Sequence, residues 1–169
     1  MQGKHTKKQI RKIDIKERLE KTVKTSRFGE IDIDKNRIFT FVEPIIGYEQ
    51  FTKYVIVEHK ANSAFKWLQS VEEPSLAFPV TFPAFFNIEY EFEIPDDKSE
   101  KLGLTSAESL IALNIVTIPN NMPQKSTINL LAPVIINANN KKGMQMILQN
   151  SDYQVQYPLF NEKQEEVKV

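Results

Sequence analysis

The segment from Phe65 to Pro83, FKWLQSVEEPSLAFPVTFP, sets the strongest limit on how this chain can fold. Two short apolar runs flank the tetrapeptide Glu72-Glu73-Pro74-Ser75, in which proline presets a turn and polar side chains can bond to the backbone. Apolar runs of this length, rich in aromatic residues and bounded by turn residues, are typical of strands. The segment therefore predicts a β-hairpin whose tip carries two adjacent carboxylates.

Similar short runs recur along the chain. Only one or two helical turns are expected, at 98–102 ending at Gly103 and after the capping-box sequence at 105–108. The spacing of the runs, without strand–helix alternation, predicts a mainly β, single-domain fold. We expect an antiparallel or mixed β-barrel-like sheet with one or two short helical turns. Besides the hairpin, the expected strands are 31–34, 37–42, 51–58, 88–94, 110–118, 127–137 and 144–148, with a last extended piece at 151–159.

The charges of the chain are unevenly distributed, although its formal net charge is zero. Residues 1–25 hold nine basic and three acidic residues, a balance of +6, whereas residues 26–169 hold 13 basic and 19 acidic ones, a balance of −6. We expect 1–25 to form a basic, flexible or weakly helical extension, 26–160 the folded domain and 161–169 a flexible tail. The opposite charges suggest different partners for the two parts, or contact between them.

The composition excludes several kinds of chemistry. The absence of cysteine excludes disulfides, thiolate metal sites and a cysteine nucleophile. Five unclustered glycines exclude a common phosphate-binding loop, and His59 stands in a connector where a solvated side chain is expected. There is no apolar run of membrane-spanning length and no secretory signal, so we expect a cytoplasmic protein. We expect no catalytic residue, metal site or cofactor, and therefore a protein that binds other macromolecules.

Two groups of residues suit such binding. Ile45 and Ile46 place apolar side chains in a loop, and Glu72 and Glu73 place charge at the hairpin tip. The segment 88–94 alternates apolar residues with three glutamates. The glutamates fit the solvated face of a strand, which is the commoner situation, or an acidic surface for a basic partner.

Several segments, in order, resemble the flagellar assembly factor FliW family. The resemblance extends from about Thr25 to Leu159. It implies a cytoplasmic, barrel-like β protein without catalytic activity, which binds flagellin and also binds the small RNA-binding regulator CsrA. By sequestering CsrA, such a protein relieves repression of flagellin mRNA translation. The segments that carry the resemblance are Phe28–Glu30, Trp67–Pro74 followed by Leu76–Phe78, Leu113–Pro119, Asn129–Asn137, and Gly143–Gln145 before Ile147-Leu148.

The resemblance gives the two groups of residues expected partners. A net acidic body would attract a basic regulator through many weak, salt-sensitive contacts, while the unassembled ends of flagellin would need an apolar groove. Ordinary packing is the favoured alternative for Trp67, Leu68, Leu130 and Pro133. The candidate partner-binding residues are Gln69, Ser70, Glu72, Glu73, Pro74, Ile45, Ile46, Tyr48, Asn129, Leu130 and Pro133.

The chain departs from the usual family pattern in residues 1–25 and in the loop before Gly47. The family usually starts near Phe28, so residues 1–25 would be additional, and the loop before Gly47 carries Pro44 where a glycine is usual.

The free protein is expected to be a monomer whose body binds neither membrane nor nucleic acid. The competing hypothesis is a small β-barrel that binds RNA directly through the basic extension.

Overall fold

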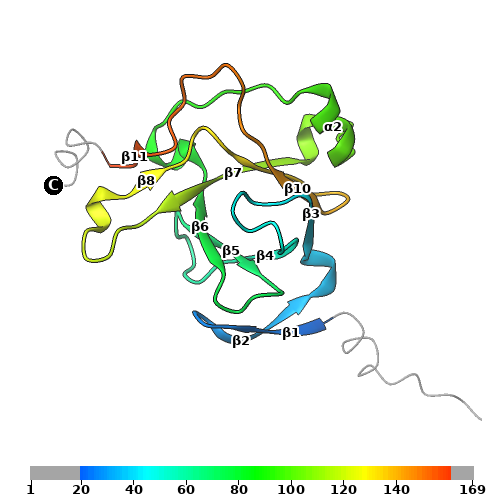
Figure 1. The fold of residues 1–169 in the computed structure, drawn as a ribbon. Coiled ribbons are helices and arrows are strands. Elements are labelled where there is room, and N and C mark those ends of the chain that lie inside the picture. Colours follow the sequence, from blue (N-terminus) through cyan, green and yellow to red (C-terminus); the bar gives the residue numbers. More distant parts are fainter. Residues whose placement is uncertain (1–19, 161–169) are drawn as a thin grey trace, which may run out of the picture.

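Seven strands close into a barrel within residues 20–160, which are the residues that the computed structural model describes (Figure 1). β3 and β10 run parallel, and the other neighbouring strands of the barrel run antiparallel. The predicted mainly β, mixed, barrel-like fold is confirmed. In order around the barrel, the strands are β7 (Leu110–Thr117), β6 (Ala77–Thr81), β5 (Lys66–Ser70), β4 (Lys53–Val57), β3 (Phe39–Glu43), β10 (Lys142–Gln145) and β9 (Val134–Asn137), which pairs back with β7.

Two hydrophobic cores share the strand β9. Because successive side chains of a strand point to opposite faces, Ile136 packs in the barrel interior with Tyr54, Leu68 and Val80, while Ile135 packs outside it. The outer core lies between the barrel wall and the segments that cross one end of the barrel. Its other buried members are Leu102, Met144, Met146 and Leu148.

The hairpin predicted at Phe65–Pro83 is confirmed. β5 and β6 pair antiparallel, with Leu68 opposite Phe78. The turn between them is held by Gln69, whose side chain is fully buried and whose Nε2 donates to the carbonyls of Ser70 at 2.9 Å and Leu76 at 3.0 Å. A buried amide with these partners fixes the tip from inside, so the carboxylates at 72 and 73 stand on a rigid support.

A second hairpin, β1 (Glu20–Thr25) and β2 (Gly29–Asp34), forms a separate two-stranded sheet at the end of the barrel opposite the crossing segments (Figure 1). Val23 and Ile33 are buried against Val55 of β4. Residues 20–25 therefore belong to the folded domain, and the predicted boundary at residue 25 is too late. The helical or flexible interpretation is wrong for these six residues, since Val23 and Thr25 are buried at strand spacing. Residues 1–19 and 161–169 lie outside the described part of the chain.

The strand predicted at 88–94 is wrong. The segment has no backbone ladder, yet its side chains keep the predicted alternation: Tyr90, Phe92 and Ile94 pack on the outer core while the intervening glutamates are exposed. The segment is held by side chains instead, because the Tyr90 hydroxyl donates to the Leu130 carbonyl at 2.6 Å. Alternating burial was correctly predicted, but burial alone does not supply a hydrogen-bonding partner strand.

The remaining elements are short. The predicted helix becomes α2 (Asp96–Leu102), which ends at Gly103 with φ of 63°, and the predicted turn at 105–108 becomes η3 (Ala107–Ser109), capped by Ser106. The strand predicted at 127–137 is interrupted before Pro133, giving only β8 (Thr127–Ile128) and β9. No helix among residues 20–160 is both long and apolar enough to span a bilayer. The other elements are η1 (Lys35–Arg37), η2 (Pro83–Phe86), η4 (Pro123–Lys125) and β11 (Tyr157–Pro158), which pairs with β8.

Candidate functional site

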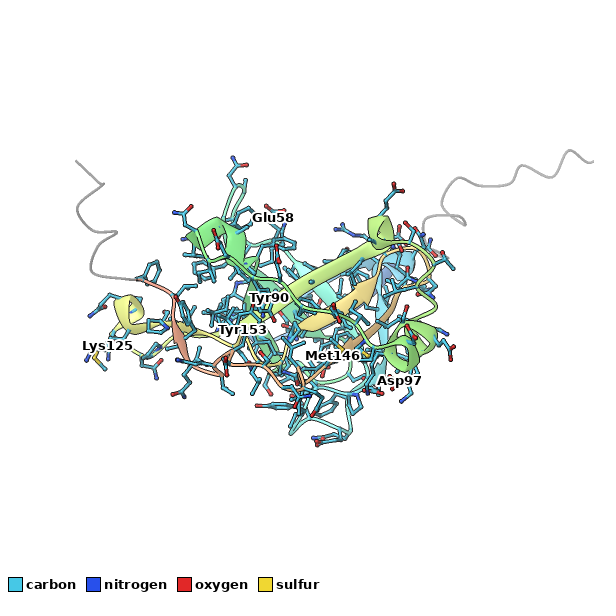
Figure 2. The ribbon with its side chains drawn as sticks, turned by 90° about the horizontal axis from the view of Figure 1, so that it is seen from above. Glu58, Tyr90, Asp97, Lys125, Met146 and Tyr153 are labelled. Atoms are coloured by element: carbon cyan, nitrogen blue, oxygen red, sulfur yellow. The ribbon has the colours of Figure 1, made fainter. Side chains whose placement is uncertain are left out.

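A groove of about 880 Å³ lies where three irregular segments meet beside the outer core. Its walls come from the loop after β3, from residues 91–95 and from residues 145–153. Figure 2 shows Met146, at the base of this region, between Tyr153 and the start of α2 at Asp97. We call this feature the β3-loop groove.

The floor of the β3-loop groove is apolar and its edges expose aliphatic side chains. Met146 and Leu148 are nearly buried beneath it, and Phe92 packs beside them. Ile46 and Ile147, by contrast, leave 53% and 49% of their surface exposed. Large aliphatic side chains exposed around an apolar floor mark a surface suited to a macromolecular partner.

Tyr153 connects two walls of the groove. Its hydroxyl accepts from the backbone N–H of Glu91 at 3.0 Å and donates to the carbonyl of the same residue at 2.9 Å. Its ring lies beside that of Tyr90 (Figure 2), and the two ring centroids are 4.8 Å apart. Burial raises the pKa of the Tyr90 hydroxyl to about 12, so at physiological pH this hydroxyl keeps the proton that it donates to the Leu130 carbonyl. The two tyrosines thus set the spacing of segments that share no backbone ladder.

The loop after β3 is held by polar contacts at its base. The Ile46 N–H donates to Oε1 of the buried Gln145 at 2.9 Å, and the Gly47 N–H donates to Oε1 of Glu49 at 2.8 Å. Gly47 has φ of 84°, which glycine adopts readily. Tyr48 turns its ring onto Phe78 at 5.0 Å and anchors the loop to β6. Ile46 is therefore presented on a loop that is fixed at both ends.

The groove carries more negative than positive charge. Glu43 is neutralised by Lys98 at 2.7 Å and Lys101 at 2.6 Å, and the hydrogen bond from Lys101, followed by that from Lys98, lowers the pKa of the Glu43 carboxyl. Hydrogen bonding from the Gly47 amide lowers the pKa of Glu49. Glu91 and Glu93 are exposed, and no ion pair joins them to a cation within residues 20–160. The edge is acidic at neutral pH.

The hairpin tip is a second acidic feature, and its carboxylates take part in the fold. Oε2 of Glu72 accepts from the backbone N–H groups of Thr52 at 2.7 Å and Lys53 at 2.8 Å. Oε1 of Glu73 accepts from the N–H and hydroxyl of Ser75, and these hydrogen bonds lower its pKa. These bonds order the tip, and Glu72 joins it to the start of β4.

The structure divides the predicted contact residues by exposure. Ile46, Tyr48, Glu72 and Pro74 are exposed. Only one of the four, Ile46, lines the groove, while Glu72 and Pro74 belong to the tip. Glu73 and Asn129 are half-buried. The buried ones, which contribute to packing or to backbone hydrogen bonds, are Gln69, Ser70, Ile45, Leu130 and Pro133.

Sequence reasoning missed most of the groove. Phe92, Ile147 and Tyr153 were treated as parts of strands, because each stands in an extended or alternating segment. One feature of the sequence does indicate this wall of the groove. Three glutamates alternate with apolar residues in 88–94 and a proline follows at 95, a pattern that fits an acidic segment leaving the sheet. Within residues 20–160, no group of three or more histidine, aspartate or glutamate side chains is arranged to hold a metal ion. His59 packs against Phe28 at 5.3 Å.

The fold and sequence together identify the family. A family model described as FliW protein matches residues 21–159, almost the whole described chain. The chain belongs to the FliW family. The flagellar assembly factor FliW of Caldicellulosiruptor saccharolyticus is 43% identical to it over 143 residues, covering 84% of this chain and 93% of the relative. That of Thermotoga neapolitana is 37% identical over 146 residues, covering 86% and 97%.

A solved FliW structure has the same architecture. A crystal structure of the flagellar assembly factor FliW superposes with a TM-score of 0.77 at 30% identity, covering 85% of this chain and 99% of the other. The FliW match starts inside β1 rather than near Phe28, so the expectation that residues up to 25 are additional to the family is corrected to the residues before 21. The β1–β2 hairpin is thus part of the FliW domain.

Proposed function

We propose that this FliW protein acts in the cytoplasm as a non-catalytic binding protein for flagellin and for a CsrA-type RNA-binding regulator. The observation that carries the proposal is the β3-loop groove, with its apolar floor, exposed Ile46 and Ile147, and acidic edge. A groove of this kind suits a flagellin segment that is apolar on one face and unpaired before assembly.

The regulator is proposed to bind through negative charge. A protein that grips RNA phosphates is basic, and the acidic tip at Glu72 and Glu73 gives it an ordered, ionised target. Exposed pairs contribute only about 1 kcal/mol or less each, so the attraction depends on many charges and falls with salt. Binding of the regulator here would hold it away from flagellin mRNA, so that free FliW permits flagellin translation.

The flagellin part of the proposal is tested by calorimetry with purified flagellin monomer. Ile46→Asp places a charge at the groove edge and is expected to weaken flagellin binding at least tenfold, since the variant must desolvate a carboxylate against an apolar partner. Val155→Asp is the matched control, because Val155 is equally exposed at 53% and does not line the groove. Equal affinity of the two variants would refute the groove as the flagellin site.

The regulator part needs a substitution that removes charge and keeps the fold. Glu72→Gln with Glu73→Gln retains the side-chain oxygens that accept from the backbone, whereas lysine at these positions would remove them. We expect the double variant to bind CsrA more weakly than wild type at low salt. The control is Glu30→Gln with Glu58→Gln, which removes the same charge elsewhere on the exposed surface. Unchanged affinity of the tip variant would exclude the tip from the contact.

A further inference from the structure

A small polar pocket of about 360 Å³ lies between the two hairpins and shares no residue with the β3-loop groove. Ser26 and Arg27, in the turn between β1 and β2, form one side of it. The other side comes from the β5–β6 hairpin, where the Pro74 carbonyl accepts from the Ser26 N–H at 2.8 Å and so joins the two hairpins (Figure 1). The remaining lining residues are Gln69, Ser75 and Ala77. We call this feature the Arg27 pocket.

The guanidinium of Arg27 is held in place by an aromatic ring. Its Cζ lies over the Trp67 ring, 3.9 Å from the ring centroid. The indole is supported in turn by the ring of Phe28, whose centroid lies 5.9 Å from that of Trp67. A guanidinium that rests on an aromatic face loses little further freedom when it binds, and its N–H donors remain available around its edge.

The positive charge of Arg27 has no partner in the described part of the chain. No ion pair joins it to a carboxylate within residues 20–160, although residues 26–169 hold 19 acidic residues and only 13 basic ones. No acidic residue of this range lines the pocket, and Oε1 of Glu73 is bonded to the N–H and hydroxyl of Ser75. An oriented, unpaired guanidinium at a polar pocket is suited to an anionic ligand.

Gln69 adds a hydrogen-bond acceptor to the pocket lining. Its side chain is fully buried, and its Nε2 is used inside the hairpin tip by the carbonyls of Ser70 and Leu76. Its Oε1 is buried as well and has no hydrogen-bond partner within residues 20–160. Because buried acceptors are nearly always paired, a ligand that donates an N–H would stabilise this oxygen.

We propose that the Arg27 pocket binds a carboxylate carried by a peptide, together with the amide N–H next to that carboxylate. The two carboxylate oxygens accept from the edge of the guanidinium, and the N–H donates to Oε1 of Gln69. One guanidinium matches the charge of one carboxylate, whereas a phosphate dianion would bring a second charge that no lining residue balances. The carboxylate can belong to a chain terminus or to an acidic side chain. This site goes beyond the proposed function, because it takes an anion, whereas the neighbouring tip is proposed to take a basic regulator.

The test uses Trp67, the only tryptophan of the chain, whose indole N–H gives a single NMR signal beside the pocket. The full-length protein is titrated at constant ionic strength with N-acetylalanine, which carries a carboxylate next to an amide N–H. N-acetylalaninamide lacks the carboxylate, and O-acetyllactate has an ester oxygen in place of the N–H. We expect N-acetylalanine to bind at least about fivefold more tightly than either analogue. The methylamide of N-acetylaspartate, with its carboxylate in a side chain, distinguishes the sources: the tighter of the two acids identifies the natural one.

Substitutions at Arg27 test the contact from the protein side. Arg27→Gln should abolish binding of N-acetylalanine, and Arg27→Lys should weaken it at least about threefold, because lysine keeps the charge but not the planar pair of donors. Arg37→Gln is the matched control. Arg37 is also exposed and, within residues 20–160, makes no ion pair and lies over no aromatic ring, so its loss should leave the affinity unchanged. Circular dichroism of each variant establishes that the barrel is folded.

Three outcomes overturn the proposal. Equal affinity for N-acetylalanine and for one of its two analogues would show that the carboxylate or the N–H makes no contact. Equal affinity of Arg27→Gln and Arg37→Gln for N-acetylalanine would remove Arg27 from the site. Tighter binding of inorganic phosphate than of N-acetylalanine would replace the peptide carboxylate by a phosphate ligand. The experiment contains neither flagellin nor CsrA, so its failure would leave the proposed function standing.

Discussion

Replacing Tyr153 by phenylalanine tests the hydrogen-bonded connection between the two groove walls. The substitution keeps the ring, and with it the packing against Tyr90, but removes the hydroxyl that both accepts from and donates to the backbone of Glu91. The wall formed by residues 91–95 has no strand partner to replace these bonds. The variant should therefore lose stability and, locally, order.

The magnitude follows from the two bonds. A hydrogen bond contributes about 0.5–1.5 kcal/mol net, and Tyr153 is only half-buried, so water can partly satisfy the Glu91 groups. We expect a loss of about 1–2 kcal/mol in the free energy of unfolding. For a domain of this size, that corresponds to a fall in Tm of about 3–6 °C.

The measurement is thermal unfolding followed by circular dichroism, together with amide hydrogen exchange at Glu91. Tyr157→Phe is the matched control, because Tyr157 is also half-buried and its hydroxyl makes no hydrogen bond within residues 20–160. Glu91 should exchange faster only in Tyr153→Phe. A Tm for this variant equal to that of Tyr157→Phe, with unchanged exchange at Glu91, would refute the reasoning.

Three other substitutions have defined outcomes. Gly143→Ala would place Cβ 2.8 Å from the ring of Phe41 at the β3–β10 pair. Urea unfolding should therefore show a loss of about 1–3 kcal/mol in the free energy of unfolding. A loss smaller than that of an exposed control substitution would contradict the clash. Glu72→Ala should cost about 1 kcal/mol, because two backbone amides at the start of β4 lose their acceptor, whereas Glu58→Ala should cost less. For Glu43, whose folded pKa lies below 4.5, the ionised carboxylate contributes stability at higher pH that is lost as pH falls through the folded pKa. The stability difference between wild type and Glu43→Gln should therefore shrink below pH 4.5, and a constant difference would exclude the ion pairs as its source.

The sequence was sufficient for those parts of the fold that depend on local pattern. The β5–β6 hairpin and the end of α2 at Gly103 were predicted because a proline turn and a left-handed glycine are local devices. Strand pairing over long distances was not predictable in the same way. β3 pairs in parallel with β10, so that Phe41 lies opposite Gly143, and nothing in the pattern of residues 37–42 states that this distant strand is its neighbour.

The groove was only partly predictable for the same reason. Ile46 was identified as an apolar residue in a loop, and it does stand exposed at the groove. Ile45, one position earlier, is buried, because the loop turns one side chain inward and the next outward. The opposite wall requires Tyr153 to meet Glu91, a contact between residues far apart in the chain that no local pattern encodes.

The parallel pairing of β3 with β10 has a consequence for synthesis of the protein. Phe41 lies opposite Gly143, so the barrel cannot close until nearly the entire domain has been translated. When translation has reached only β7, the edge of β3 still lacks its partner β10. Unpaired strand edges of this kind readily pair with other chains. Closure between distant parts of the chain is also slow compared with hairpin formation. The period before β10 emerges is therefore the interval in which a nascent chain is most exposed to misassembly.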